Sequence, residues 1–351
     1  VNSVGSSFNY YNRSLFNNRY DEETQARAKN KFRASLDDAF DSIALAPISD
    51  GRKFGIDGKK VQLESIISVF ENSIPLENRG SGMESLIKTQ IAFSKAADLD
   101  VVLMEEPENH LCFATMRKML SEINEHGEES QIIVTTHSSM IACSLNLKNV
   151  LWIAEGQVQS LRDVDDDVAS FFTKADSNAF LQLLLSKKAL LVEGATEFIL
   201  LPRLYNQIFG RSIESDEITI IPCGGISYKR YLDIAEKARK KVSVLTDNDG
   251  HEERIEEARN YNESHHNQHI FMAADPDDWT WEVCFYHDNK EILDDLIEVQ
   301  PKAQYMFHGK DYGPVLGKML NNKADTAYEM LVSDAEFRVP QYVRDAIRWL
   351  N

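Results

Sequence analysis

The stretch ALLVEGATE, residues 189–197, joins an apolar run to two glutamates, and VLTDNDG, residues 244–250, joins a second apolar run to two aspartates. Short apolar runs of this kind predict strands that are buried on both faces, as in a parallel α/β sheet. A helical pattern follows each run, so both predicted strands belong to strand–helix units. The carboxyl ends of such strands meet at one edge of the sheet, where open α/β sheets place their sites.

Four carboxylates are expected at that edge. Glu193 ends the first strand, and Glu197 follows one helical turn later on the same side. Asp247 and Asp249 are separated by one residue, so in extended geometry both would project the same way. Carboxylates at close range repel one another unless a cation lies among them, and hard oxygen ligands bind Mg²⁺ or Mn²⁺. We predict a divalent-metal site here; the alternative is two acidic turns that cap helix N-termini.

A glycine pair follows a further predicted strand in IPCGGISYKR, residues 221–230. Glycine lets the backbone approach a ligand closely. The pattern predicts phosphate or DNA contacts from Gly224, Gly225, Ser227 and Lys229. A plain turn is the alternative interpretation.

The N-terminal half carries a second constellation. VVLMEEPENHL, residues 101–111, predicts a buried strand that ends in Glu105 and Glu106, and IIVTTHSS, residues 132–139, predicts a neighbouring strand followed by His137. In P-loop ATPases, carboxylates at such a strand end lie near the nucleotide's Mg²⁺ and the attacking water. An imidazole at the next strand end can contact a γ-phosphate.

A glycine-containing segment precedes the next predicted helix, at Gly80-Ser81-Gly82. Glycines at a helix N-terminus allow backbone N–H groups to face phosphate. With the two strand ends, this segment predicts half of an ATP site, formed by Ser81, Gly82, Glu105, Glu106 and His137. Two solvated glutamates and a structural histidine are the alternative.

The nucleotide-cradling half of such a site is missing, because no G-x-x-x-x-G-K-[ST] pattern occurs in the sequence. The chain begins at Val1 rather than at a methionine. We interpret Val1 as an interior residue of a longer protein whose N-terminal part supplies the P-loop. On this interpretation the 351-residue chain alone does not turn over ATP.

These motifs together resemble a known family. E-G-x-x-E followed by a strand and D-x-D is similar to the Toprim domain of topoisomerases, primases and several nucleases. Residues 75–140 resemble an ABC-type ATPase head, with signature loop, Walker B strand and switch histidine in order, although Glu105 stands where Walker B usually has aspartate. An ABC-type head followed directly by Toprim resembles the overcoming-lysogenization-defect (OLD) family of ATP-dependent endonucleases, over roughly residues 75–330.

The resemblance implies two further site residues. Glu282, in DDWTWEV, matches the acidic residue that would complete a second metal site, and Lys323, in NNKADTAYEML, matches a lysine beside the scissile phosphate. It also implies the domain organisation of an α/β protein. Residues 1–165 would form the C-terminal part of an ABC-type ATPase domain, and residues 186–351 a Toprim nuclease domain. The latter would combine a parallel sheet flanked by helices with a helical C-terminal extension.

Composition narrows the function classes. The net charge of -18 argues against a protein that coats DNA non-specifically. Four cysteines without a CxxC pair suit a reduced, cytoplasmic interior better than a disulfide framework. No apolar stretch reaches the length of a membrane span, so we expect no membrane association.

The sequence therefore predicts a metal-dependent DNA endonuclease that hydrolyses phosphodiesters with two Mg²⁺ or Mn²⁺ ions. Its resemblance implies ATP-gated access to the nuclease, a homodimer or larger assembly, and a role as a bacterial anti-phage effector. A regulatory protein or nucleic acid would be a further partner. The alternative from another class is a non-catalytic, nucleotide-regulated sensor that binds DNA ends or a partner protein. A primase or topoisomerase is the remaining alternative, but the latter needs a DNA-gate domain for which the chain has no room.

Overall fold

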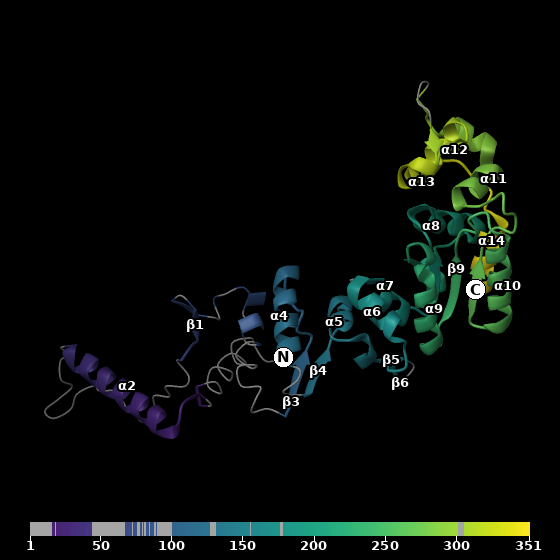
Figure 1. Ribbon diagram of the computed structural model, residues 1–351. Helices are drawn as coiled ribbons and strands as arrows, with labels where there is room; N and C mark the ends of the chain where they lie inside the picture. The colour runs from purple at the N-terminus through teal and green to yellow at the C-terminus, as the bar shows by residue number, and fades with distance from the viewer. Residues whose placement is uncertain are drawn as a thin grey trace. The chain divides into compact units, whose positions relative to one another are not determined.

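The computed structural model describes residues 16–17, 19–43, 67–71, 73–75, 78, 80, 82–83, 85–87, 89, 100–126, 131–154, 156–175, 178–300 and 305–351. The chain divides into two compact units, Val1–Thr135 and Thr136–Asn351. This division falls earlier in the sequence than the expected domain limits at 165 and 186, which stay a prediction. Figure 1 labels the elements of both units.

The first unit contains one long helix and two small sheets. Helix α2 (Glu22–Ser42) begins after Asp21, whose Oδ1 accepts a 2.6 Å hydrogen bond from the Thr24 backbone N–H. Strands β1 (Phe70–Glu71) and β2 (Ile74–Pro75) pair antiparallel, whereas β3 (Val101–Glu105) and β4 (Gln131–Thr135) pair parallel. Helix α4 (Phe113–His126) connects β3 to β4, which confirms the predicted strand–helix–strand unit.

Strands β3 and β4 are less buried than their apolar sequences predicted. Both alternate between exposed and partly buried residues, and the Leu103 side chain is 75% exposed. The prediction of strands buried on both faces was therefore wrong for this pair. An apolar run shows that a strand suits a buried position, but it does not show that a second layer covers it.

The second unit opens with short elements that pack beside the main sheet. A hairpin is formed by β5 (Leu151–Ala154) and β6 (Gln157–Ser160), and Gly156 adopts the positive φ of 75° that its turn requires. Three helices and a 3-10 turn complete this part: α5 (Ser139–Ser144), η4 (Leu147–Asn149), α6 (Asp166–Ala175) and α7 (Asn178–Leu185).

The centre of the second unit is a four-stranded parallel sheet in the order β10-β9-β7-β8. Its strands are β7 (Lys188–Val192), β8 (Ile218–Pro222), β9 (Lys241–Leu245) and β10 (Gln268–Phe271). Helix α8 (Ala195–Phe209) follows β7, α9 (Tyr228–Lys237) follows β8, and α10 (Glu252–Ser264) follows β9. This arrangement confirms the predicted α/β class with a parallel sheet flanked by helices.

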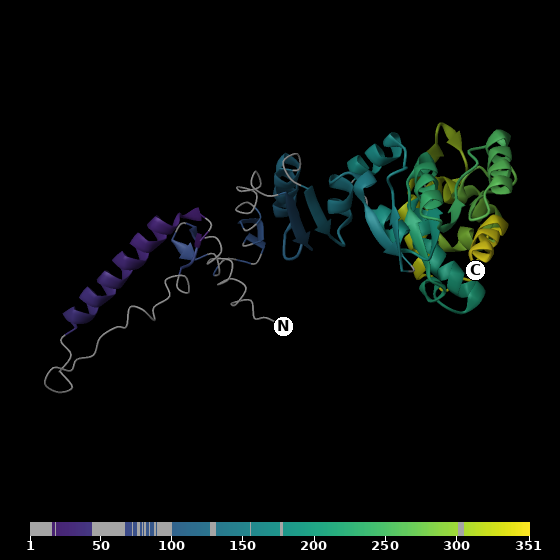
Figure 2. The same cartoon turned by 90° about the horizontal axis from the view of Figure 1, so that it is seen from below.

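The C-terminal region is helical, as expected. It consists of α11 (Trp281–Leu296), the short hairpin β11 (Met306–Phe307) and β12 (Lys310–Asp311), α12 (Pro314–Asn321), α13 (Lys323–Val332) and α14 (Gln341–Leu350). Helix α14 returns to the sheet and packs against β9 and β10, as Figure 2 shows for the yellow C-terminal helix.

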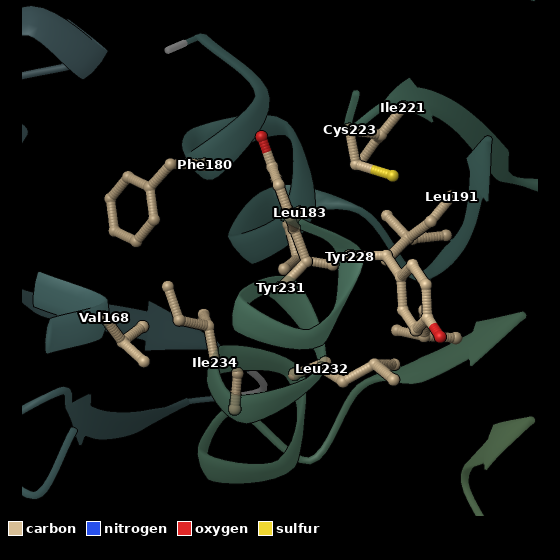
Figure 3. Close-up of a cluster of buried hydrophobic side chains, with 14 of the residues drawn as sticks. Val168, Phe180, Leu183, Leu191, Ile221, Cys223, Tyr228, Tyr231, Leu232 and Ile234 are labelled. Atoms are coloured by element: carbon tan, nitrogen blue, oxygen red, sulfur yellow. The ribbon is translucent and has the colours of Figure 1, made fainter. Parts of the chain in front are cut away.

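Two hydrophobic cores lie on opposite faces of the sheet because successive strand residues point to opposite sides. Leu191 belongs to the core under α7, α9 and α10, which is drawn in Figure 3. Leu190 and Val192 belong to the core under α8, α11 and α14. The sheet is thus covered on both faces, and its carboxyl edge is the place where polar residues gather.

In the described part of the chain, no helix combines the length and apolar character that crossing a bilayer requires.

Candidate metal centre at the carboxyl edge of the parallel sheet

Strands β7 and β9 bring the first and third predicted carboxylates to one edge. The two strands are adjacent and parallel, with Val192 paired to Leu245 at their ends. Glu193 therefore leaves the sheet beside the loop that contains Asp247. One Glu193 oxygen, Oε2, accepts hydrogen bonds from the Thr246 hydroxyl at 2.7 Å and from the Asp247 backbone N–H at 3.1 Å. This carboxylate is thus fixed to the end of the neighbouring strand.

Asp247 faces the start of α11. Its Oδ1 accepts a 2.9 Å hydrogen bond from the Trp281 backbone N–H, one of the free donors of the helix N-terminus. Burial raises the pKa of Asp247 to about 8, with further contributions from the charges of Glu193, Glu197 and Glu282. A carboxyl group with this pKa ionises readily at neutral pH only when positive charge is supplied nearby.

Glu282 lies in the first turn of α11 and is 1% exposed. Its Oε1 accepts a 2.8 Å hydrogen bond from the Thr196 hydroxyl, and its Oε2 accepts one of 2.8 Å from the Thr280 hydroxyl. The same Oε2 lies 2.8 Å from Nζ of Lys323, the first residue of α13. The two residues that the family resemblance added are therefore ion-paired with each other.

Glu197 completes the group from the first turn of α8. It is 4% exposed, and Thr196 beside it reaches Glu282. The pKa of Glu197 is raised to about 7, chiefly by burial and also by the charges of Glu282 and Glu193, against the opposing charge of Lys323. The mutual influence of these groups places Glu193, Glu197, Asp247 and Glu282 in one electrostatic cluster.

Lys323 is the cation of this cluster. Burial alone would lower the pKa of Lys323, but the charges of Glu282, Asp247 and Glu197 outweigh burial and raise it. The ammonium group is therefore protonated throughout the neutral range. Its positive charge acts on the neighbouring carboxyl groups of Glu282, Asp247 and Glu197.

Asp249 lies apart from the cluster. Strand β9 ends at Leu245, and Asp249 has a positive φ of 53°, so the alternation expected for an extended D-x-D segment does not apply. Its half-exposed carboxylate forms an ion pair with Arg254 in the first turn of α10. Its backbone N–H donates to the carbonyl of Trp279.

The donor set has the chemistry that Mg²⁺ and Mn²⁺ prefer. Three segments bring carboxylates together in a mostly buried site, and burial and mutual repulsion raise the pKa of two of them. Among the described residues, no three His, Cys, Asp or Glu side chains converge as a ready-made metal site. The oxygens of Glu193 and Glu282 are instead held by threonine hydroxyls and by Lys323. The residues therefore fit a divalent ion in charge and donor type.

The predicted phosphate loop follows β8. Gly224 and Gly225 have φ values of 66° and 59°, which favour glycine. The Ser227 hydroxyl donates to the backbone carbonyls of Cys223 and Gly224, so it stabilises the loop itself. Lys229 is exposed in the first turn of α9.

The predicted ATP-site residues of the first unit lie at and near the end of β3. Glu105 and Glu106 are exposed, and Glu106 has a φ of 41°, its N–H donating to the Thr135 carbonyl at 2.8 Å. Gly82 approaches the segment after this strand, because a Cβ at Gly82 would lie 2.3 Å from the His110 carbonyl oxygen. Ser81 lies outside the described residues.

In the second unit, His137 follows β4 by two residues and lines a shallow cavity with residues of α7.

The sequence reasoning missed the hydroxyl groups that hold the carboxylates. Thr196 lies between the two glutamates of E-G-A-T-E, Thr246 precedes Asp247, and Thr280 precedes Glu282 by two residues. A short hydroxyl side chain beside each acidic residue was the available signal. Arg254, the partner of Asp249, had no signal in the sequence, because only the fold of the loop brings them together.

Comparison with known proteins agrees with this geometry. Residues 184–249 match the family model for the Toprim domain of overcoming-lysogenization-defect-like proteins, and residues 4–142 match an AAA ATPase domain model. The Old nuclease of Escherichia phage P2 is 26% identical over 155 residues, which are 40% of this chain and 25% of that protein. The chain thus matches about a quarter of the length of this relative.

The ATPase match begins well before residue 75, where the sequence motifs first indicated it, and the Toprim match ends before Glu282 and Lys323. An ATPase domain is followed by an OLD-like Toprim domain whose parallel sheet carries the acidic edge described above. The chain has the ATPase–Toprim architecture of the OLD family.

Proposed function

We propose that the chain is a metal-dependent DNA endonuclease that hydrolyses phosphodiester bonds at the carboxyl edge of its Toprim sheet. The observation that carries this proposal is the cluster of Glu193, Glu197, Asp247 and Glu282 around Lys323, built from β7, the β9 loop, α8, α11 and α13. A site that gathers this much buried negative charge beside a single lysine is costly unless it binds cations. DNA binding gives a second reason to expect cations at this site. The negatively charged phosphates of DNA would be repelled by these carboxylates unless cations lay between them.

Two Mg²⁺ or Mn²⁺ ions would be held by Glu193 and Asp247 on one side and by Glu197 and Glu282 on the other. Asp249 would join the first pair only on leaving Arg254, with which it forms an ion pair. Bound divalent ions would supply an activated water and neutralise the developing phosphate charge. The chain's own residues prepare the site. Thr196, Thr246 and Thr280 orient the carboxylates, and the Lys323 ammonium is available to contact the scissile phosphate.

Gly224, Gly225, Ser227 and Lys229 would guide the DNA backbone past this edge. Lys229 is exposed. Both glycines have a positive φ, which favours glycine over other residues, and without side chains they leave the loop backbone open to a ligand. Since the Ser227 hydroxyl is used within the loop, its contribution would be to hold the glycines in place.

The ATPase domain would regulate access to the nuclease. Ser81, Gly82, Glu105, Glu106 and His137 would contribute to an ATP site whose P-loop lies elsewhere, and nucleotide binding would pair ATPase domains in a homodimer or larger assembly. In the cytoplasm of a bacterium, a nuclease controlled in this way would serve as an anti-phage effector, with a protein or nucleic acid as its trigger.

The direct test is Asp247→Asn. The amide oxygen retains the acceptor for the Trp281 N–H, while one of the clustered charges disappears, so the fold should be kept or slightly stabilised. Cleavage of plasmid DNA with Mn²⁺ should fall by more than roughly 10²-fold, beyond the loss expected for an outer-sphere partner of a metal.

The matched control is Asp277→Asn, which removes the same charge from an exposed position near the same edge. This variant should cut at the wild-type rate. If Asp247→Asn cuts as fast as Asp277→Asn at saturating Mn²⁺, Asp247 is not part of the nuclease site.

A further inference from the structure

A cavity of about 320 Å³ lies between the first turn of α9 and one face of α10, from Arg254 to Tyr261. Helix α9 contributes Tyr228 and Lys229, one face of α10 contributes Arg254, Glu257, Ala258 and Tyr261, and Ile270 of β10 completes the lining. Both helices begin at the carboxyl ends of sheet strands, so Lys229 and Arg254 in their first turns lie toward the same edge of the sheet as the carboxylate cluster. Its volume is at the lower end of the range for small-ligand sites.

Arg254 connects this cavity to the carboxylate cluster. Its guanidinium forms an ion pair with Asp249, which follows Asp247 by two residues. Burial raises the pKa of Tyr228, and Arg254, which hydrogen-bonds the phenol, partly offsets that effect. The charge of Glu193 also acts on the Tyr228 phenol. Arg254 thus lines the cavity and also contacts Asp249, in the loop that carries the cluster residue Asp247.

The lining combines flat aromatic walls with charged groups. Tyr228, Ala258 and Ile270 are 5%, 6% and 7% exposed, so they form a dry apolar floor. Figure 3 shows the Tyr228 ring next to Leu191 in the core below. The partly buried Tyr261 ring lies on the same face of α10, and its hydroxyl donates to Gln268 Oε1 at 2.5 Å.

The charged groups lie on the helices that form the walls. Lys229 and Arg254 are cations suited to a phosphate, and the exposed Glu257 is an acceptor suited to the N–H groups of a base. A simple anion would need the cations but not the aromatic walls. A hydrocarbon would need the walls but not three charged residues.

We infer that this cavity receives one unstacked nucleotide of the DNA strand that is cut, with its base over the apolar floor beside Tyr261 and its phosphate at Lys229 and Arg254. The inference rests on the proposed function and adds a substrate class to it. Extruding a base costs least in single-stranded, frayed or mismatched DNA. Such DNA should therefore be bound in preference to perfect duplex.

The test measures binding rather than cutting. A single-stranded oligonucleotide with one 2-aminopurine is titrated into the chain without divalent metal, because this base changes fluorescence when it stacks on an aromatic ring. Glu257→Trp places a large side chain at the wall of the cavity from an exposed helix position. It should weaken oligonucleotide binding roughly tenfold and abolish the fluorescence change, since base stacking accounts for factors of this size.

The matched control is Glu256→Trp, the adjacent exposed glutamate, which does not line the cavity. It should bind as the wild type does, and circular dichroism should show α10 intact in both variants. Equal binding and equal fluorescence changes for the two tryptophan variants would overturn the inference. A wild-type chain that gives no fluorescence change would overturn it as well.

Two further measurements distinguish this inference from a site for free nucleotides and from the proposed nuclease activity. Adenosine monophosphate that binds as tightly as the oligonucleotide would mean that a free nucleotide, rather than a DNA strand, is the ligand, and would overturn the strand assignment. A chain that binds the oligonucleotide through the cavity but never cuts DNA with Mg²⁺ or Mn²⁺ would support the cavity while contradicting the proposed nuclease.

Discussion

At the scale of single residues, the cluster is held by neutral donors rather than by neutralising charges. Threonine hydroxyls and backbone N–H groups bind Glu193, Asp247 and Glu282, and they leave most of the negative charge in place. Lys323 is the exception, because it forms an ion pair with the buried Glu282 carboxylate. The lysine thus has a structural role as well as the proposed role at the phosphate.

Replacing Lys323 should lower the free energy of unfolding, and bound metal should reduce that loss. Lys323→Met leaves the Glu282 carboxylate buried without its cation, and should lower the free energy of unfolding by about 1–3 kcal/mol without metal. The loss should shrink at saturating Mn²⁺, because the ion would then neutralise the same carboxylate. Urea unfolding with and without MnCl₂ measures both values.

Lys318→Met is the matched control. Lys318 forms a 2.7 Å ion pair with Glu329 between α12 and α13, and Glu329 has no part in the carboxylate cluster. Its loss of stability should be the same with and without Mn²⁺. If Mn²⁺ leaves the effect of Lys323→Met unchanged, the ion does not bind beside Glu282.

Some of these residues were predicted from local sequence pattern and others only from the family resemblance. Glu193 and Asp247 follow directly from their position after apolar strands, and the structure places them at adjacent strand ends. Glu282 and Lys323 came only from family resemblance, because α11 and α13 return to the edge through packing that no local pattern encodes. Asp249 was expected beside Asp247, but a positive φ turns it toward Arg254.

At the scale of elements, α13 holds Lys323 at the site, and α8 holds α13. Arg203 of α8 donates hydrogen bonds to the backbone carbonyls of Met330, Leu331 and Ala335 at and beyond the end of α13. The Leu331 carbonyl lies in the last turn of α13, where helix carbonyls lack intrahelical partners, so Arg203 caps this end of the helix. Arg203, which follows Thr196 by seven residues, therefore fixes the helix that carries Lys323.

Arg203→Met should loosen that helix without touching the carboxylates. We expect a loss of about 2–3 kcal/mol in the free energy of unfolding, the scale of hydrogen bonds to charged groups. Hydrogen exchange should accelerate over residues 323–332 more than over α10. Arg259→Met, which removes an exposed pair with Glu256, is the control and should leave exchange in α13 unchanged. Equal exchange in the two variants would contradict this role for Arg203.

The positions of strands in the sequence were easier to predict than the layers that cover them. The Toprim strands were found at their predicted places because an apolar run followed by a helical pattern is a local property of the sequence. The exposure of β3 and β4 was not foreseen, since it depends on which layers cover the strands. The same reason explains why the cavity between α9 and α10 had no signal in the sequence.

At the scale of the whole molecule, both hydrophobic cores of the sheet and all members of the carboxylate cluster belong to the unit Thr136–Asn351. A chain that starts at Thr136 should therefore fold without residues 1–135. Its Tm should rise on addition of saturating MnCl₂ by the same amount as the Tm of the 351-residue chain, which differential scanning fluorimetry measures. A truncated chain that folds but no longer responds to Mn²⁺ would show that the first unit completes the metal site.

The order of the site residues along the chain has a consequence for biosynthesis. Glu193 leaves the ribosome first and Lys323 last, so the cluster lacks its cation until the final helices have been made. At ~5–20 residues per second, the 130 residues from Glu193 to Lys323 take roughly 6–26 seconds. During that time the nascent chain holds unmatched carboxylates and an uncovered sheet face, because α14 is also still missing. Under the proposed function, the nuclease site would form only after α13 and α14 have been synthesised.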